Sequence, residues 1–355
     1  MNTSVDAMAM DAERPRTPRV APHATHKLKL LLRREFWEHK GGFFWAPIWA
    51  GGISLLLTLM ALVVGEVAAR RALASGKMQV DGEVMVNGLD LGMITSRMDA
   101  EDMRRLAGGI DLSMLTSSMW PMIVLGFVVF FYCLGSLYDE RKDRSVLFWK
   151  SLPVSDRDTV LSKVASAVLV APALAVAAWI ATMFAFLLLV SGFVLAHGGN
   201  PLTLLWGPGS PLANAGVMIA SIPVYAVWAL PTVGWLMLCS SWARSKPFLW
   251  AIMIPVMAGI FISWFDVMNA VDLDSGWFWR NVVARALGGV FPGTWIDVAN
   301  TDVLQLKRPG DMIHQGALLK TMYSVLATPQ AWIGAVAGVA MIAASIRMRR
   351  WRDEG

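Results

Sequence analysis

Two neighbouring stretches decide the fold: SMWPMIVLGFVVFFYCLGSL at residues 118–137, and YDERKDRSVLFWKSLPVSDRDTVLSK at residues 138–163. The first stretch contains no charged side chain, and its length matches a helix that crosses the hydrocarbon core of a bilayer. A further apolar run, residues 164–196, begins where the polar stretch ends. The pattern predicts two membrane-spanning helices joined by a charged loop.

The composition of the whole chain extends this interpretation. Of its 355 residues 56% are hydrophobic and only 16% are charged, against roughly 25% charged in soluble domains. We therefore expect an all-α polytopic membrane protein within residues 44–346. Its six predicted spans lie at about 44–65, 118–137, within 164–196, 214–240, 248–265 and 329–346.

Charge distribution predicts the orientation of these spans. With both termini on the cytoplasmic side, 20 of the 31 Lys and Arg residues fall in cytoplasmic segments, as the positive-inside rule requires. No Asp, Glu, Lys or Arg falls inside any predicted span. An intramembrane proton relay is therefore not expected to drive this protein.

The segments flanking the spans differ in character. Residues 1–26 predict a disordered tail, residues 27–43 a basic amphipathic helix in the membrane interface, and residues 347–355 a cytoplasmic tail. On the interfacial helix, Leu28, Leu32 and Phe36 share a face with Leu31 beside them, and Gly41-Gly42 is expected to end it.

Two external segments are large. Residues 66–117 form a loop with helix-compatible residues near 100–106, and residues 266–328 contain the aromatic runs WFW and FPGTW. The second segment is too apolar for a free loop and too broken for a span. It predicts short helices that re-enter the outer leaflet or lie at its interface before the last span.

Catalytic and metal-binding motifs are absent from the sequence. The five histidines have no metal-ligand spacing, and Cys133 and Cys239 match no ligand pattern within their apolar runs. The pair Gly76-Lys77 has Arg71 where a phosphate-binding loop needs its first glycine. We therefore expect no enzyme activity and no cofactor in this chain.

Aromatic residues stand at the centre of the charged loop 138–163. A merely solvated linker has no need of Phe148 and Trp149, whereas a loop that docks onto another protein does. Within this loop, Ser155 with Asp158 predicts a helix start, so the third span would begin in the loop. Pro172 would then interrupt that helix and act as a hinge.

A family resemblance follows from three motifs. LYDERKDRSVLFWKSLPVSDRDTVLSK at residues 137–163, REFWEHK at 34–40 and SWARSKP at 241–247 resemble segments of the permease subunits of type 2 ATP-binding cassette (ABC-2) exporters. The order of interfacial helix, six spans and external insertions is similar to that family as well. The long first external loop sets the chain apart from compact polysaccharide and lipid exporters of this type.

The resemblance implies a bacterial inner-membrane protein and its partners. Two permease chains, as a homodimer or an unlike pair, would assemble with separate ATPase subunits that bind ATP and Mg. Membrane lipid is expected to surround the protein, and nucleic acid is not expected to bind it. The interfacial "elbow" helix and the loop between spans two and three would contact the ATPase.

Within these two regions, the charged and aromatic side chains are the residues that we expect to carry the coupling. In the loop they are Asp139, Glu140, Arg141, Arg144, Phe148, Trp149, Lys150, Leu152, Pro153 and Asp156, and in the elbow helix Arg34, Glu35 and Glu38. Phe148, Trp149 and Leu152 are the expected apolar anchors, and the charges would set the register.

Two other functions stay open on the sequence alone. The chain could be a non-transporting scaffold or sensor that recruits partners through its external loops. An intramembrane enzyme is a third class, for which the sequence offers no nucleophile and base within reach. The small-residue motif Gly334-x-x-x-Gly338 permits close helix contact, either within one chain or between two.

Overall fold

The computed structural model describes residues 24–75, 99–143, 154–268, 274–296 and 315–351, and these residues form helices and turns with no β-strand among them. The predicted all-α class is confirmed. Six of the described helical segments are long enough and apolar enough to cross a membrane. They are Gly41–Ala72, Ala100–Lys142, Asp156–Ala196, Pro211–Trp242, Pro247–Val267 and Pro329–Trp351. The chain is a multi-pass helical membrane protein.

The described part of the chain contains α-helices and shorter π-helical and 3-10 turns. In chain order they are α2 (Ala24–Glu38), η1 (Gly41–Trp45), α3 (Ala46–Ala74), α5 (Ala100–Ser117), α6 (Trp120–Gly135), α7 (Tyr138–Lys142), α9 (Asp156–Ala165), η2 (Ser166–Val170), α10 (Ala171–Ala196), η3 (Leu202–Trp206), α11 (Pro211–Trp242), α12 (Pro247–Val267), α13 (Ser275–Phe278), η4 (Trp279–Val283), α14 (Ala284–Gly288), α15 (Gln315–Ser324), η6 (Val325–Ala327) and α16 (Pro329–Trp351).

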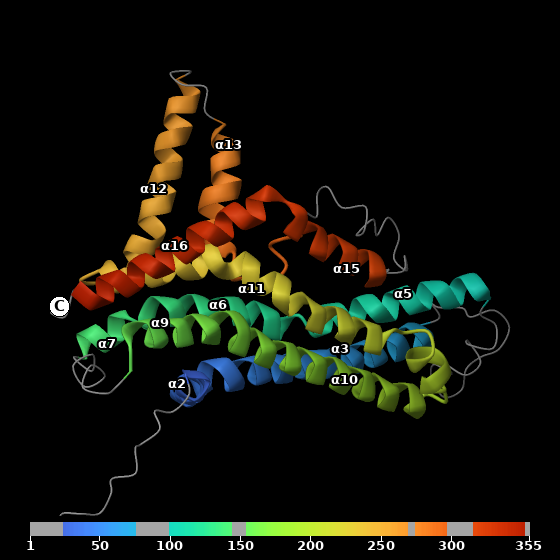
Figure 1. Ribbon diagram of the computed structural model, residues 1–355. Coiled ribbons are helices and arrows are strands. Elements are labelled where there is room, and N and C mark those ends of the chain that lie inside the picture. The colour runs from blue at the N-terminus through green and yellow to red at the C-terminus, as the bar shows by residue number, and fades with distance from the viewer. Residues whose placement is uncertain (1–23, 76–98, 144–153, 269–273, 297–314, 352–355) are drawn as a thin grey trace, which may run out of the picture.

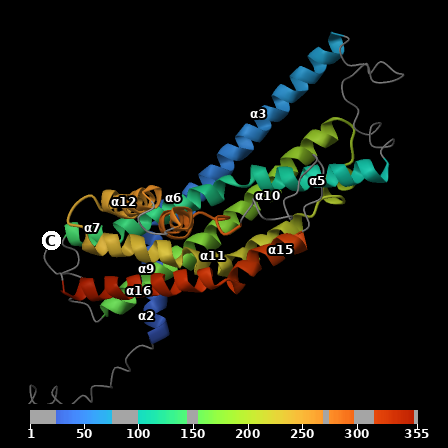
Figure 2. The ribbon, with the colours of Figure 1, turned by 90° about the horizontal axis from the view of Figure 1, so that it is seen from above.

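Most of the long helices run side by side in an elongated bundle, whereas α12 and α13 rise steeply from it (Figure 1). α6 packs against α3, α10 and α11, and α11 makes its most extensive contact with α16. The core between them includes Val129, Trp179, Val224 and Leu236, each almost fully buried. Seen from above, α2 and α3 point in clearly different directions (Figure 2).

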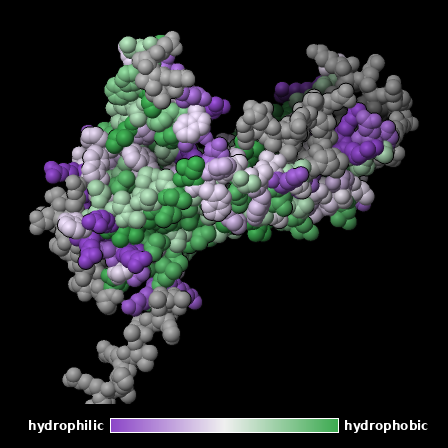
Figure 3. All heavy atoms as spheres, turned by 45° about the horizontal axis from the view of Figure 1, so that its top comes forward, coloured by the Kyte–Doolittle hydropathy of each residue, from purple (hydrophilic) through white to green (hydrophobic). Residues whose placement is uncertain are grey.

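The surface of the molecule is divided by polarity. In Figure 3, apolar side chains cover much of the bundle and of the protruding α12, while hydrophilic side chains gather mainly toward the two ends. On α12, exposed side chains include Trp250, Phe261 and Trp264. Such a distribution is expected where the middle of a protein faces hydrocarbon and its ends face water.

The elbow helix packs on the bundle through a face different from the predicted apolar stripe. Leu31 and Glu35, four residues apart, are the buried positions of α2, while Leu28 is 39% exposed. At Gly41 the regular helix gives way to one π-helical turn, η1, which leads directly into α3. The predicted change at Gly41-Gly42 is therefore a bend in a nearly continuous helix.

The third span begins inside the charged stretch, as predicted. Ser155 caps α9, and its hydroxyl accepts a hydrogen bond from the Asp158 backbone N–H at 3.1 Å. A π-helical turn, η2, ends directly before α10, where Pro172 occupies the first turn. The irregularity therefore lies in the turn before this proline, which lacks the N–H that a continuous α-helix would use.

The small-residue motif of the last span packs within the chain. A Cβ atom added to Gly338 would lie 2.5 Å from the carbonyl carbon of Leu230 on α11, so only glycine allows the two backbones to approach so closely. The last helix also continues to Trp351, beyond the predicted end of the span near residue 346. Arg349, expected in a tail, therefore belongs to α16.

Candidate coupling site

Four charged side chains are buried together at one end of the bundle. Glu35 lies on α2, Glu140 on α7, Lys163 on α9 and Arg349 on α16, and each is at most 7% exposed. We call these four residues the ion cluster. They are the meeting point of the elbow helix with the ends of the second, third and sixth spans.

Lys163 lies at the centre of the ion cluster. Its Nζ donates hydrogen bonds to Oε1 and Oε2 of Glu35 at 3.1 and 3.3 Å. The same ammonium group lies 3.1 Å from Oε1 of Glu140. Arg349 closes the cluster on the other side, with its Nη1 at 2.5 Å from Oε2 of Glu140. Two carboxylates and two cations thus compensate one another in charge.

Aromatic rings cover the Glu35 side of the cluster. The Tyr132 hydroxyl, on α6, donates a hydrogen bond to Oε2 of Glu35 at 2.8 Å. The Tyr132 ring in turn contacts His39 and Phe43 edge-on, with ring centroids 4.7 and 4.9 Å apart. These rings keep water from Glu35 and so strengthen its interaction with Lys163.

A partly exposed rim surrounds the cluster. Arg349 Nε donates to Oδ1 of Asp156 at 3.1 Å, which joins α16 to the start of α9. Arg34 pairs with Glu38 at 3.3 Å, one turn along α2 as the sequence spacing predicts, and also lies 3.6 Å from Glu140. The rim therefore joins α16 to α9 and α2 to α7, two pairs of helices that the ion pairs of the cluster do not join directly.

Arg141 connects α7 to the end of α11 through hydrogen bonds. Its Nη2 donates to the carbonyl oxygens of Ser240 and Ala243 at 2.6 and 2.9 Å. The Ser240 hydroxyl accepts from the backbone N–H groups of Leu137 and Tyr138 at 3.1 and 2.9 Å. The chain reversal after the second span is thereby anchored to the end of α11.

The expected coupling residues therefore occupy different environments. Glu35 and Glu140 are inside the bundle rather than on a docking surface, because each has a buried cationic partner. Asp139 and Glu38 are exposed, and Arg34, Arg141 and Asp156 are half-buried. Pro172 is buried near the start of α10. Arg144, Phe148, Trp149, Lys150, Leu152 and Pro153 lie outside the residues that the structure describes.

Lys163, Arg349 and Tyr132 were not among the predicted site residues. Lys163 carries the strongest signal in the sequence, since it is the last charge before an apolar run and lies about two helical turns after the capping residue Ser155. Arg349 looked like one of several basic residues in a tail. Only the packing of α16 against α9 shows that it is enclosed.

A buried ion cluster of this kind holds elements in a fixed register. Removing one partner of a buried ion pair costs about 3–5 kcal/mol, because the other charge is left without compensation. The four helices that contribute to the cluster should therefore move together rather than separately. In the described part of the chain, no group of three or more His, Cys, Asp or Glu residues could hold a metal ion.

Comparison with known proteins gives no relative for this chain. No family model matches it, and neither a curated protein nor a solved structure does. The function therefore has to be argued from the residues and their geometry.

Proposed function

We propose that the chain is the permease subunit of an ATP-binding cassette exporter and is driven by a separate ATPase. The observation that carries the proposal is the place of the ion cluster. Glu140 and Lys163 lie near the two ends of the charged loop 138–163 and contact each other in this cluster, so both ends of the loop are held at one place. A force applied to the loop would reach three spans and the elbow helix at once.

The charge pattern supports an external source of energy. The charged side chains of the cluster are compensated by one another at one end of the bundle, and none of them marks a path across it. A phosphate-binding loop is missing from the sequence, so ATP hydrolysis would belong to the partner. Phe148 and Trp149 on the loop would be the anchors in a groove of that partner.

Pairing with a second permease chain has a structural argument of its own. α12 stands away from the bundle and exposes large apolar side chains, among them Trp250, Phe261 and Trp264 (Figure 1). A second copy of this chain would cover the exposed helix, and lipid would cover the remaining apolar surface. The positive-inside distribution of charge supports cytoplasmic termini, and the resemblance to ABC-2 permeases supports placement in a bacterial inner membrane.

The competing function is a membrane scaffold or sensor that transports nothing. The large external segments favour it, and the ion cluster would then serve only to hold the helices together. A gene for an ATP-binding cassette ATPase beside the gene for this chain is expected under our proposal. The scaffold function does not require one.

Co-purification distinguishes the two functions directly. The tagged full-length chain is extracted in mild detergent from cells that also express the neighbouring ATPase, and the complex is measured for ATP turnover in nanodiscs. Our proposal expects an ATPase that elutes with this chain and hydrolyses ATP faster than it does alone. Separate elution with unchanged turnover would support the scaffold.

A further inference from the structure

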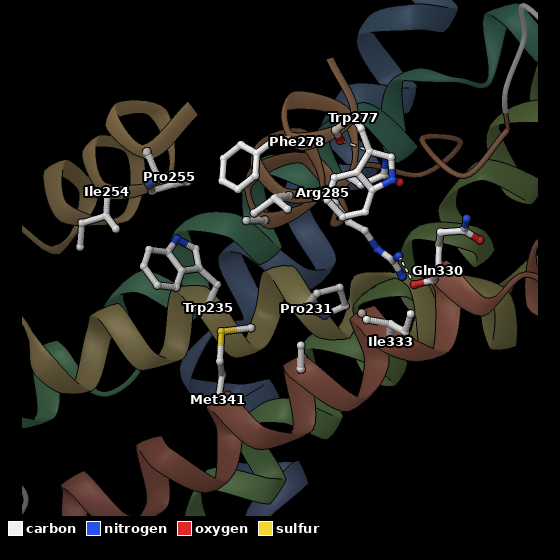
Figure 4. Close-up of a pocket in the computed structure, with 16 residues that line it drawn as sticks. Pro231, Trp235, Ile254, Pro255, Trp277, Phe278, Arg285, Gln330, Ile333 and Met341 are labelled. Atoms are coloured by element: carbon white, nitrogen blue, oxygen red, sulfur yellow. Dashed lines mark hydrogen bonds between the residues drawn. The ribbon is translucent and has the colours of Figure 1, made fainter. Parts of the chain in front are cut away.

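A cavity separate from the ion cluster lies where α12 and α13 meet the bundle. Its volume is about 390 Å³, within the range of small-molecule sites, and it is lined by residues of α11, α12, α13–α14 and α16 (Figure 4). The lining is almost wholly apolar and includes Pro231, Trp235, Ile254, Ala258, Phe278 and Met341.

One charged side chain borders this apolar cavity. Arg285 on α14 is 7% exposed, and Figure 4 shows its guanidinium group directed toward Gln330 at the start of α16. Its Nη1 donates to the carbonyl oxygen of Gln330, and its Nη2 donates to that of Ala331 at 3.1 Å. The guanidinium carbon also lies 4.1 Å from the ring centroid of Trp228.

Gly334 of the last span makes room for this arginine. A Cβ atom at position 334 would lie 2.5 Å from the guanidinium carbon of Arg285. The first glycine of the Gly334-x-x-x-Gly338 motif thus leaves space for the Arg285 side chain, and the second allows the close backbone contact with α11. Arg285 is therefore a buried part of the cavity wall and not a surface side chain.

The charge of Arg285 has no counter-ion among the residues that the structure describes. Its partners there are neutral carbonyl groups and an aromatic ring, and its Nε has no hydrogen-bond partner. Burying a cation without an anion is expensive, and charged residues of this kind in membrane proteins usually mark a functional site. An anionic group from a ligand would supply the missing charge.

The length and polarity of the cavity indicate the chemistry of the ligand beyond its anionic group. Arg285 and Gln330 stand at one end, and Met341 lies roughly 16 Å further along α16. The cavity is therefore cationic at one end and apolar along its length. An acyl chain with an anionic head has the same division of polarity.

We propose that this cavity binds an anionic phospholipid, with its phosphate at Arg285 and one acyl chain along α16 toward Met341. The site is formed by α11, α12, α16 and the segment from α13 to α14 of this chain, so it stands whether or not the chain is an exporter permease. The lipid would fill the angle between the protruding α12–α13 hairpin and the bundle, and it would thereby hold the hairpin in place.

Photolabelling in nanodiscs tests the site on the full-length chain. The probes are phosphatidylglycerol and phosphatidylcholine that carry the same photoactivatable acyl chain, and labelled peptides are mapped by mass spectrometry. We expect phosphatidylglycerol to label the cavity-lining peptides of α12 and α16 roughly tenfold more than phosphatidylcholine, because the choline group of phosphatidylcholine already compensates the charge of its phosphate. Equal labelling by the two lipids would overturn the proposal.

Matched variants distinguish lipid labelling in the cavity from lipid labelling on the rest of the apolar surface. Ala337 lines the cavity, whereas Ala340, three residues further along α16 and also exposed, does not. Ala337→Phe should remove the phosphatidylglycerol labelling, and Ala340→Phe should keep it. Arg285→Met should make the two lipids label alike. Equal labelling of the two alanine variants would contradict the site even if Arg285→Met fails to fold.

Discussion

Lys163 is the residue on which the ion cluster depends most, because its ammonium group faces two buried carboxylates. It is 1% exposed and contacts Glu35 and Glu140 at 3.1 Å each. Neither carboxylate can turn to water without moving a helix. Both buried carboxylates, Glu35 and Glu140, therefore depend on the Lys163 side chain for charge compensation.

Replacing Lys163 with Met should destabilise the protein strongly. The substitution keeps the length of the side chain and removes its charge, so Glu35 and Glu140 lose a shared partner. We expect a loss of about 3–5 kcal/mol in the free energy of unfolding, read as a lower midpoint of thermal unfolding in detergent. Arg157→Met on the same helix is the control, since Arg157 is exposed. Equal midpoints for the two variants would show that the cluster contributes little.

At the scale of helices, the contact between α11 and α16 limits what the last span can accept. Gly338 lies against the backbone of Leu230 and Pro231, and no flexible side chain there can move aside. This close backbone approach belongs to the most extensive contact between two helices in the described part of the chain.

Gly338→Ala should therefore weaken this contact. The added methyl group would overlap backbone atoms at 2.5 Å, and overpacking of this kind costs about 1–3 kcal/mol. Gly192→Ala on α10 provides the opposite case, because its methyl group would meet open space and helical alanine is favoured by roughly 0.5–1 kcal/mol. Thermal unfolding should order the proteins as Gly192→Ala, native, Gly338→Ala. A Gly338→Ala variant as stable as the native chain would contradict the close backbone contact.

The helices could be predicted from the sequence, and their contacts could not. Apolar runs of the right length, the Ser155 cap and the glycines at 41–42 are local signals, and the observed helices follow them closely. The ion cluster depends on contacts such as Lys163–Glu35, whose residues are 128 positions apart in the chain. A buried charge and a solvated charge look alike in a sequence until the packing of the helices is known.

The same limit applies to Arg285 and to the elbow helix. Residues 266–328 were expected to hold short helices near the membrane, and α13, α14 and α15 lie there, but nothing in the sequence distinguishes Arg285 from an exposed arginine. On α2, the spacing of Leu28, Leu32 and Phe36 predicted an apolar face for the membrane interface, and it did not show which residues pack on the bundle. Leu31 and Glu35 are the residues that turn inward, and Glu35 pairs there with Lys163.

At the scale of the whole molecule, the exposed α12 is the feature that a single copy leaves unexplained. Its apolar side chains protrude on a helix that touches the rest of the chain mainly near its base and through α13 and α14 (Figure 1). In a membrane, lipid alone could cover such a helix. A second copy of this chain would cover it with shape-matched side chains as well.

Cysteine crosslinking should detect a dimer through α12. Phe261→Cys places a thiol on the exposed face of α12, and the two native cysteines are buried, so background crosslinking should be low. We expect a disulfide-linked dimer on mild oxidation in membranes, because equivalent residues meet near a two-fold axis. Leu57→Cys on the exposed face of α3 is the control. Dimer yields that do not exceed those of the control would argue against pairing through α12.

The central claim is that the charged loop receives the movement of a separate ATPase, and one measurement tests it most directly. Pull-down of the cognate ATPase and its ATP turnover in nanodiscs are compared for the native chain, Phe148→Ala, Trp149→Ala and, as a control on an exposed tryptophan of α3, Trp49→Ala. Loss of an aromatic anchor costs about 2 kcal/mol or more, so each loop variant should bind the ATPase roughly thirtyfold more weakly and stimulate it less, while Trp49→Ala should match the native chain. Unchanged binding and unchanged stimulation in both loop variants would contradict the claim.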